Sequence, residues 1–599
     1  MGILATQEQL DIVETAKNGQ DLRIQAFAGS GKTSTLVLVS QELIKPSLYL
    51  AYNKAMAEEA KAKFPPHVEV RTTHSLAYAH IGNQYKHKLE RPRGRYINVA
   101  GTGSEIGKFF KIKDIELSDD KKLSSAAIGL AIKTTVNTFE YSDDVVISEK
   151  HIPQSLIEDF KNRKGFIEST FKKTVLRYAK LLWEERTDLS SIVLCTHDTY
   201  MKLFQLSNPN LSGYEVLYGD EFQDANACFL DIFCKQTAQK IAVGDTFQAI
   251  YQWRGSVNAM EKLKYNQLCL TQSFRFGKQI GDVATQVLRD NKTGQLINEV
   301  KGWDRIHSVA SDELNFDGTY TILFRTNAAL LAEAVSLLSQ GFKLNIEVDM
   351  KDFVKLLSSA LALYSGDTKN VKHEDIVPFN TWNELETEGK ANGELTRVVK
   401  IIKDGSALRY IKILENHYNT TEPDIILTSC HKAKGREWDI VVLANDFPSP
   451  YDSKGRWIGL DLAERNLLYV AVTRAKKALQ YNQSVVDMLS WYGEASCDLN
   501  VRVKGIVKVD KYNIHKLPAF IDNNIGEHAL DAVLRGVDEL DMLESFERGE
   551  MSSEEAYDMG LIDEMGASVF SGDLYNQGSI GGVIDNHLTY MPTLGKRGK

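Results

Sequence analysis

Residues 25–35 read QAFAGSGKTST, a glycine-rich stretch that ends in Gly-Lys-Thr and decides the fold class of the chain. In such a stretch the backbone N–H groups converge on phosphate oxygens, Lys32 reaches the terminal phosphates, and the Thr33 hydroxyl can bind Mg²⁺. The usual pattern, G-x-x-x-x-G-K-[ST], departs here only at its first position, which is Ala26. We therefore predict a nucleoside triphosphate site. Its residues would be Ala28, Gly29, Ser30, Gly31, Lys32, Thr33 and Ser34.

Working outward, a second stretch at residues 216–224 reads VLYGDEFQD. It begins apolar, as a strand buried in a parallel sheet does, and ends in adjacent carboxylates. Asp220 can hold Mg²⁺ through water, and Glu221 can polarise the attacking water. A lone Asp-Glu pair after apolar residues is usually a solvated loop, but together with Lys32 it predicts a site of NTP hydrolysis.

Length and composition are typical of a large globular protein with several domains. The 599 residues are 43% apolar and 25% charged, enough for about three to five domains. Six cysteines, at 195, 228, 234, 269, 430 and 497, show no C-x-x-C spacing, which argues against zinc and against disulfides. The sequence has no signal peptide and no apolar run of about 18 residues, so we expect neither export nor membrane spanning, and a cytoplasmic location.

The net charge of −9 is unevenly distributed along the chain. Residues 521–599 hold 16 Asp or Glu and 5 Lys or Arg, whereas residues 1–520 hold 64 and 66. A nearly neutral body can still carry a local basic groove, because phosphate binding depends on where Lys and Arg lie. Net charge therefore neither supports nor excludes a nucleic-acid partner.

Five further stretches occur in a fixed order along the chain. They are LATQEQ at 4–9, VGDTFQAIYQWRG at 243–255, LTQSFR at 270–275, TSCHKAKGREWD at 428–439 and ERNLLYVAVTRA at 464–475. With the two above, this order resembles the UvrD/Rep/PcrA-like superfamily 1 DNA helicases over roughly residues 4–480. The resemblance implies ATP and Mg²⁺ as cofactors.

The resemblance assigns roles within the ATP site. Gln9 would read the adenine edge, Phe274 would lie on the adenine, and Gln248 and Arg275 would contact the γ-phosphate. Arg474 would be a second arginine finger, and Gly435 and Glu437 would also belong to the nucleotide site. The predicted catalytic residues are then Lys32, Asp220, Glu221, Gln248, Arg275 and Arg474, and the predicted metal ligands are Thr33 and Asp220.

Single-stranded DNA needs aromatic platforms and a phosphate track. Trp253 and Tyr251 closely follow Gln248 and could stack on bases, although buried core aromatics are the alternative for both. The full predicted DNA-binding set is Tyr52, Asn53, Lys54, Thr73, His74, Tyr251, Trp253, Arg254 and His431. Single strands and single/double-strand junctions are the expected partners.

Within the family, the resemblance is strongest to the F-box DNA helicases and their bacterial or viral relatives. It rests on YLAYNKAMAEEA at 49–60, TTHS at 72–75, THDTYMKLFQL at 196–206 and HKAKGREWD at 431–439. Only 25 residues precede the phosphate loop, too few for an F-box, so we do not expect coupling to a ubiquitin ligase. A bacterial cell or a virus-infected host cell is the expected setting.

Apolar strand-like runs that alternate with helical stretches predict an α/β fold with parallel sheets. We expect two RecA-like motor domains, each interrupted by an inserted, mainly helical subdomain. The predicted bounds are 1–75 and 187–275 for the first motor domain, 76–186 for its insertion, 276–330 and 421–485 for the second, 331–420 for its short insertion, and 486–599 for a C-terminal extension, acidic from about 521. The cluster Arg91, Arg93 and Arg95 could contact duplex DNA or be a solvated loop.

Three functions fit these features. The first is an ATP-dependent DNA helicase that moves 3′ to 5′, with the polarity taken from the resemblance. The second is a translocase that strips proteins from single strands. The third is an NTP-driven switch that acts through a protein partner at the acidic tail, which could also be a DNA mimic or a solubilising extension.

Overall fold

The computed structural model describes residues 5–492 except for 90–100, 118–121, 162–163, 252–257, 291–292, 296–298, 316–317, 378, 380, 389–392 and 418. The predictions for Trp253, Arg254, the cluster Arg91, Arg93 and Arg95, and the acidic tail lie outside the described residues.

Six parallel strands form the first sheet, in the order β3-β2-β6-β7-β1-β8. They are β1 (Leu22–Ala26), β2 (Ser47–Ala51), β3 (Val68–Thr72), β6 (Val216–Gly219), β7 (Gln239–Gly244) and β8 (Asn266–Leu270). The central strands are apolar because both of their faces are covered: every residue of β2 and β6 is buried. The carboxyl ends of β1 and β6 carry the two stretches predicted to bind phosphate and metal.

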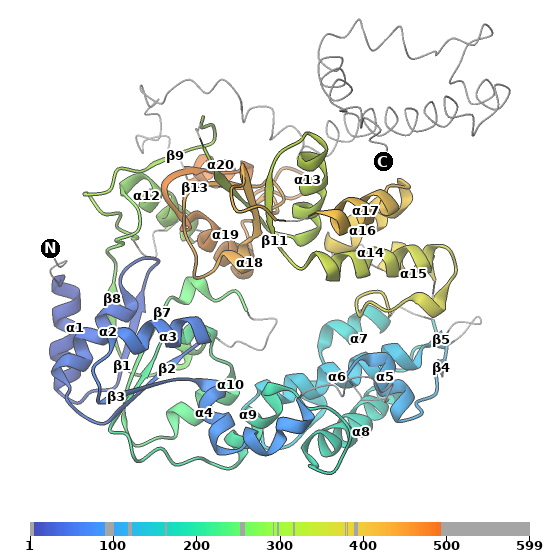
Figure 1. Cartoon of the computed structure of the whole chain (residues 1–599), viewed down its shortest axis with the longest axis horizontal. Coiled ribbons are helices and arrows are strands. Elements are labelled where there is room, and N and C mark those ends of the chain that lie inside the picture. The colour runs from blue at the N-terminus through green and yellow to red at the C-terminus, as the bar shows by residue number, and fades with distance from the viewer. Residues whose placement is uncertain are drawn as a thin grey trace, which may run out of the picture. The chain divides into compact units, whose positions relative to one another are not determined.

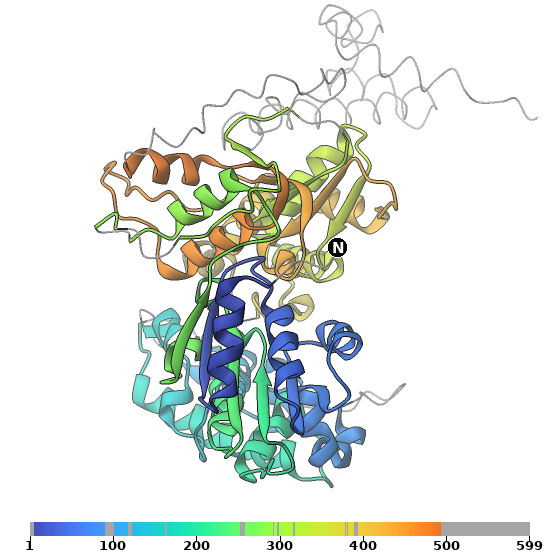
Figure 2. The ribbon, with the colours of Figure 1, turned by 90° about the vertical axis from the view of Figure 1, so that its left-hand side faces the viewer.

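Helices cover both faces of this sheet. The helices are α1 (Gln7–Lys17), α2 (Lys32–Glu42), α3 (Lys54–Lys63), α4 (Thr73–His80), α9 (His197–Leu206), α10 (Ala227–Cys234) and α11 (Ala259–Lys262), with short 3₁₀ turns η3 (Phe222–Asp224) and η4 (Thr246–Gln248). Alternate strand residues point to opposite faces: Tyr49 and Tyr218 pack with the α1–α3 side, whereas Leu50 and Leu217 pack with α4, α9 and α10. Figure 2 shows these strands running side by side, with helices of the blue N-terminal segment against them.

The second sheet also has six parallel strands, in the order β11-β12-β10-β13-β14-β9. They are β9 (Val309–Ser311), β10 (Tyr320–Phe324), β11 (Leu344–Glu347), β12 (Ile425–Ser429), β13 (Trp438–Leu443) and β14 (Ala475–Gln480). Its helices are α12 (Lys278–Val287), α13 (Asn327–Ser339), α18 (Cys430–Ala433), α19 (Leu462–Val472) and α20 (Gln483–Trp491). The predicted α/β class with two parallel sheets is confirmed (Figure 1).

Two mainly helical segments interrupt the sheets. Between β3 and β6 lie η1 (Gly82–Lys88), α5 (Gly103–Phe109), the antiparallel pair β4 (Ile115–Glu116) and β5 (Lys122–Leu123), α6 (Ser125–Tyr141), η2 (Glu149–His151), α7 (Gln154–Lys161) and α8 (Glu168–Thr187). Between β11 and β12 lie α14 (Met350–Tyr364), η6 (Thr368–Asn370), α15 (Trp382–Glu388), α16 (Gly393–Lys403) and α17 (Ala407–Asn416). Because β11 pairs with β12, the second sheet extends into the stretch 331–420 that the sequence suggested as inserted.

Glycines allow the helices of the first insertion to pack closely. A Cβ on Gly129 of α6 would lie 2.0 Å from the Gly103 carbonyl oxygen of α5, and one on Gly103 would lie 2.6 Å from the Ala126 carbonyl oxygen. Only glycine permits this approach. The rest of this core is apolar, with Ile128, Ile132 and other aliphatic side chains fully buried.

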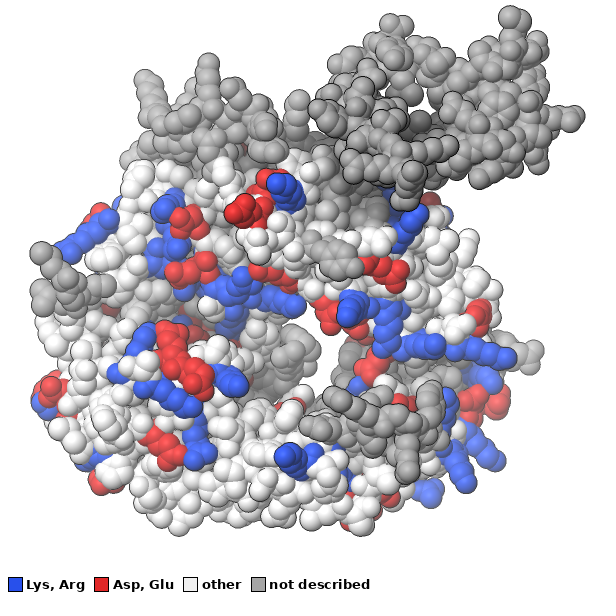
Figure 3. Space-filling model, in the orientation of Figure 1, with Lys and Arg blue, Asp and Glu red and all other residues white. Residues whose placement is uncertain are grey.

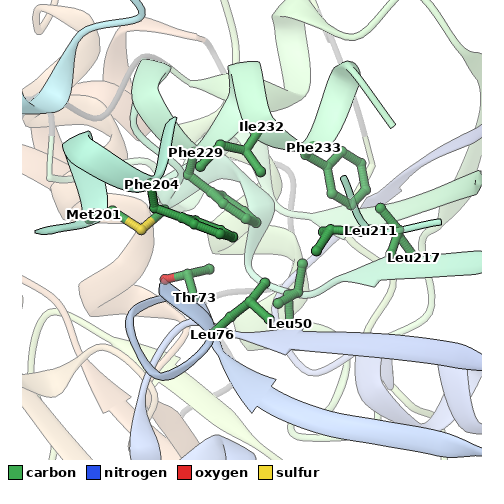
Figure 4. Close-up of a pocket in the computed structure, with 10 residues that line it drawn as sticks. All are labelled: Leu50, Thr73, Leu76, Met201, Phe204, Leu211, Leu217, Phe229, Ile232 and Phe233. Atoms are coloured by element: carbon green, nitrogen blue, oxygen red, sulfur yellow. The ribbon is translucent and has the colours of Figure 1, made fainter. Parts of the chain in front are cut away.

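An apolar pocket lies beneath the first sheet, between the strands and helices α4, α9 and α10 (Figure 4). Leu50, Leu76, Phe204 and Phe229 are among the side chains that converge there, and they leave no space for a water molecule. This pocket is therefore part of the core and not a ligand site.

Five cysteines lie in the described residues, and all five are free thiols. No described helix combines the length and the apolar character that crossing a membrane requires. On the face drawn in Figure 3, Lys and Arg are interspersed with Asp and Glu over the described surface.

Candidate active site

The loop between β1 and α2 has the backbone of a phosphate-binding loop. Gly29 and Gly31 adopt left-handed φ values of +74° and +79°, which glycine tolerates best. A Cβ on Gly29 would lie 2.6 Å from Ser273 Oγ, so the loop also needs glycine for close packing. No side chain caps the N-terminus of α2. Its first N–H groups and the positive end of the helix dipole can therefore bind an anion.

Lys32, Thr33, Asp220 and Glu221 meet at this loop. Lys32 Nζ lies 3.1 Å from Glu221 Oε1. The Thr33 hydroxyl donates to Asp220 Oδ2 at 2.8 Å, and the Tyr49 hydroxyl donates to the same oxygen at 2.6 Å. The side chains of Lys32 and Glu221 are only 11% and 19% exposed, so their charges interact in a largely water-excluded site.

Charge and burial pull the pKa values of these groups in opposite directions. Burial disfavours charged Lys32, but Glu221, Asp245 and Asp220 outweigh it and hold its pKa above the ordinary value. Burial, helped by the negative charge of Glu221, raises the pKa of Asp220. Burial also acts on Glu221, yet the nearby Lys32 and Lys434 lower its pKa, which keeps Glu221 ionised as a base must be.

The donors at Thr33 and Asp220 fit Mg²⁺. A hydroxyl and a carboxylate are hard oxygen ligands, and Mg²⁺ commonly uses one or two protein ligands together with waters and substrate phosphates. The described residues contain no cluster of three or more His, Cys, Asp or Glu side chains that could hold a metal by themselves. The residues present therefore suit a metal that arrives with a nucleotide.

A chain of hydrogen bonds leads from Glu221 to Gln248. Gln223 Nε2 donates to Glu221 Oε2 at 2.6 Å, and Gln223 Oε1 accepts from the Asp245 N–H at 2.9 Å. Gln248 Nε2 then donates to Asp245 Oδ2 at 2.7 Å. Gln223 and Asp245 are fully buried, so this chain fixes Gln248 relative to the hydrolysis site.

Helix α19 and the residues after it, which belong with the second sheet, place side chains against the phosphate loop and Gln248. The Tyr469 hydroxyl accepts from the Ala28 N–H at 3.2 Å and donates to Asp245 Oδ2 at 3.1 Å. Arg474 Nη2 donates to Gln248 Oε1 at 3.3 Å. Arg474 is 1% exposed, and burial together with the nearby Arg275 lowers its pKa to about 9, so it remains charged at neutral pH.

Phe274 and Arg275 follow β8 and reach the loop from its other side. The Phe274 N–H donates to the Gly29 carbonyl at 2.8 Å, and the Phe274 ring would lie 3.8 Å from a Cβ on Gly31. Arg275 Nε donates to Glu437 Oε2 at 2.6 Å, and Nη1 donates to the Thr473 carbonyl at 3.0 Å. In this state both predicted arginine fingers bind protein groups.

Gln9 is also committed to protein partners. Its Nε2 donates to Thr35 Oγ1 at 3.0 Å, and its Oε1 accepts from the Thr6 N–H at 3.0 Å, which completes a capping box at α1. Gln9 Nε2 lies 3.5 Å from the position of a Cβ on Gly31, so the side chain borders the loop. Each bond uses only one of the two hydrogens on Nε2 and one of the two lone pairs on Oε1, so the amide keeps a donor and an acceptor for its predicted role at adenine. Gly435 lies near Glu437 in the chain and adopts a left-handed φ of +81°.

Five of the predicted DNA-binding residues lie near one another in contact or in sequence. The rings of Tyr52 and Tyr251 stack with centroids 6.1 Å apart, and the Tyr251 hydroxyl donates to the His431 carbonyl at 3.0 Å. Asn53 accepts from the Met56 N–H at 3.0 Å and caps α3, so its side chain already has a structural role. Lys54 is exposed beside it. Burial lowers the pKa of His431 and favours its neutral form.

Thr73 and His74 begin α4, the helix after β3. His74 Nε2 lies 3.1 Å from Asp198 Oδ1, and its ring meets that of Tyr200 edge to face. Thr73 borders the apolar pocket of Figure 4.

Comparison with known proteins agrees with this geometry. The family model for the UvrD/REP helicase N-terminal domain matches residues 5–267. The family model for the UvrD-like helicase C-terminal domain matches residues 195–483. Together these matches span both sheets and the nucleotide loop. The chain belongs to the UvrD-like helicase family.

Relatives of this UvrD-like chain include two F-box DNA helicases. It is 32% identical over 535 residues to F-box DNA helicase 1 of Gallus gallus, covering 82% of this chain and 50% of the relative. It is 31% identical over 566 residues to F-box DNA helicase protein 1 of Schizosaccharomyces pombe, covering 86% and 61%. The ATP-dependent DNA helicase PcrA of Bacillus subtilis is 23% identical over 408 residues, covering 59% and 53%. The chain thus spans about half to three fifths of the length of these three relatives.

The residues of this UvrD-like site that sequence reasoning missed include Asp245, Lys434 and Tyr469. Each lies inside a stretch quoted for the family resemblance, so the signal was present. It was not specific, because a buried tyrosine or lysine in an apolar stretch is indistinguishable from a core or surface residue until its partners are known. Lys434 illustrates this: its partners are Asp224 and the Gln248 carbonyl, 210 and 186 residues away.

Proposed function

We propose that the chain is an ATP-dependent DNA helicase that moves 3′ to 5′ on single-stranded DNA. The observation that carries the proposal is the bonded path from Glu221 to Gln248 and on to Arg474, which joins residues following both sheets at one phosphate loop. Two domains that share one site can open and close as ATP binds and leaves.

The side chains divide the work of hydrolysis. Lys32 binds the terminal phosphates, and Glu221, held ionised and oriented by Gln223, accepts the proton of the attacking water. Arg275 and Arg474 exchange their bonds to Glu437, Thr473 and Gln248 for the γ-phosphate and stabilise its developing charge. Bound Mg²⁺, at Thr33 and Asp220, would neutralise further phosphate charge.

Coupling to DNA follows from chain connectivity. Gln248 is three residues before Tyr251, whose ring stacks with Tyr52. A base that stacks on this pair would therefore contact a residue only three positions from Gln248, the proposed γ-phosphate sensor. Aromatic stacking suits a motor because it tolerates any base and is worth about 1–3 kcal/mol per base.

The subdomain bounds given above, with the second insertion beginning after β11, a preference for single/double-strand junctions, and a protein partner at the acidic C-terminal tail belong to the same proposal. They are supported by the family resemblance and by composition.

The test is steady-state ATP hydrolysis with and without single-stranded DNA, run beside unwinding of duplexes that bear a 3′ or a 5′ tail. We expect strong stimulation and unwinding from the 3′ tail. Stimulation without unwinding would favour a translocase that strips proteins, and hydrolysis indifferent to DNA would favour an NTP-driven switch. Unwinding from only the 5′ tail would contradict the polarity.

A further inference from the structure

Lys434 lies where the hydrolysis loop meets the tyrosine stack. It follows α18, and its ammonium donates to Asp224 Oδ2 at 2.5 Å and to the Gln248 carbonyl. The ammonium also lies 5.0 Å from the centroid of the Tyr251 ring, a cation–π contact. The side chains of Lys434 and Asp224 are 8% and 1% exposed. One ammonium therefore contacts both Asp224, next to the proposed hydrolysis site, and Tyr251, in the tyrosine stack.

Stability alone is a poor explanation for this ion pair. Taking two charges out of water costs about as much as their attraction returns, unless every polar atom is satisfied. Asp224 Oδ1 is buried and has no hydrogen-bond partner among the described residues. The pair is thus incompletely compensated, in a position where apolar side chains could fill the same volume.

Connectivity shows what the pair links. Asp224 is three residues after Glu221 and belongs to the same short turn, η3. Tyr251 is held at its ring by Lys434 and at its hydroxyl by the carbonyl of His431, three residues earlier in the same segment. A displacement of the Tyr251 ring must therefore change the surroundings of the ammonium that binds Asp224 and the Gln248 carbonyl.

We propose that Lys434 is a positioning residue that transmits the stacking of a base at Tyr251 to the hydrolysis loop through Asp224 and the Gln248 carbonyl. The inference rests on the proposed DNA-dependent hydrolysis. Lys434 does not touch the reacting atoms; it sets how strongly bound DNA accelerates hydrolysis.

The test compares Lys434→Met/Asp224→Asn, which leaves no uncompensated buried charge, with the single variants Lys434→Arg and Asp224→Asn. Oligodeoxythymidine is titrated into each protein. Three quantities are measured: the maximal stimulation of ATP hydrolysis, the DNA concentration that gives half of it, and DNA affinity by fluorescence anisotropy. Thermal unfolding shows that each variant is folded.

We expect the maximal stimulation of the double variant to fall by about tenfold, within the range of couplings between sites, while its DNA affinity changes by less than about threefold. Lys434→Arg should retain most of the stimulation, because it keeps the charge. Wild-type stimulation in the folded double variant would overturn the inference. So would a loss that saturating DNA restores, since Lys434 would then be only a DNA contact. Absence of stimulation in the wild-type protein would instead overturn the proposed function.

Discussion

At the scale of single residues, the proposed nucleotide site is built from side chains that already have protein partners. Arg275 binds Glu437, Arg474 binds Gln248, and Lys32 pairs with Glu221. Such partners keep buried charges compensated while no phosphate is present. In the proposed cycle, each side chain exchanges its protein partner for phosphate when the nucleotide arrives.

Glu221→Gln should reduce ATP hydrolysis by about 10²- to 10⁴-fold, because the amide cannot accept the proton of the attacking water. Nucleotide binding, measured with a fluorescent ATP analogue, should persist because Lys32 and the loop backbone remain. Glu215→Gln removes an equivalent charge from an exposed side chain, 60% accessible, just before β6 and serves as the control. Full turnover of Glu221→Gln would show that another group is the base.

Glu333, on α13, gives a pH-dependent prediction. It is 7% exposed, has no hydrogen-bond or ion-pair partner among the described residues, and burial raises its pKa from 4.5 to about 7. The folded protein therefore holds this proton more tightly than the unfolded chain between those pH values. The contribution to the free energy of unfolding is fully present below about pH 4.5 and is lost as the pH rises to 7.

Glu333→Gln should accordingly raise the thermal midpoint at pH 8 and have little effect at pH 4.5. The pKa shift from 4.5 to about 7 corresponds to at most about 3 kcal/mol in the free energy of unfolding. Thermal unfolding of both proteins at the two pH values makes the comparison, with Glu415→Gln, an exposed change on α17, as the control. An equal effect at both pH values would show that the carboxyl group does not titrate in this range.

At the scale of elements, the strands followed from the sequence better than the packing between helices. The apolar start of the stretch 216–224 predicted a strand buried in a parallel sheet, because burial on both faces demands such residues. The membership of β11 in the second sheet was not anticipated, because LNIE is short and alternates like a half-buried edge strand. The contact of Gly103 with Gly129 left no pattern that sequence reasoning could use.

Gly129→Ala should destabilise the first insertion by about 1–3 kcal/mol or more, although alanine favours helices, because its Cβ would overlap the Gly103 carbonyl oxygen. Gly213→Ala places its Cβ in open space and is the matched control. Thermal unfolding and limited proteolysis measure the effect. Equal stability of the two variants would mean that α5 moves aside without cost.

At the scale of the whole molecule, residues that follow different sheets share one buried network. The sequence predicted most members of this network, including Lys32, Gln248 and Arg474, from their motifs. It could not predict which of them bond to one another, since several of those contacts join residues far apart in the chain, such as Arg474 and Gln248, which are 226 positions apart. Tyr469 is the clearest example, with partners 441 and 224 residues away.

Tyr469→Phe removes a hydroxyl that serves both the phosphate loop and Asp245, so it should reduce kcat/KM for ATP by about tenfold. A buried hydrogen bond to a charged group is worth about 1.5–3 kcal/mol, which covers this effect. Tyr481→Phe, a buried change on the residue after β14, serves as the control, and steady-state kinetics make the comparison. If both variants matched the wild-type protein, the hydroxyl would have no part in joining the two halves.

Two adjacent residues bind to different halves of the protein. The Phe274 N–H donates to the Gly29 carbonyl, beside the first sheet, whereas the Arg275 side chain donates to Glu437 and to the Thr473 carbonyl, beside the second sheet. A rotation of one half against the other about these two residues would be centred on the proposed nucleotide site. In a rotation about such a point, the atoms nearest the axis move least and the atoms farthest from it move most. In the proposed helicase, a small closing movement around the phosphates would therefore become a larger displacement at surfaces far from residue 274.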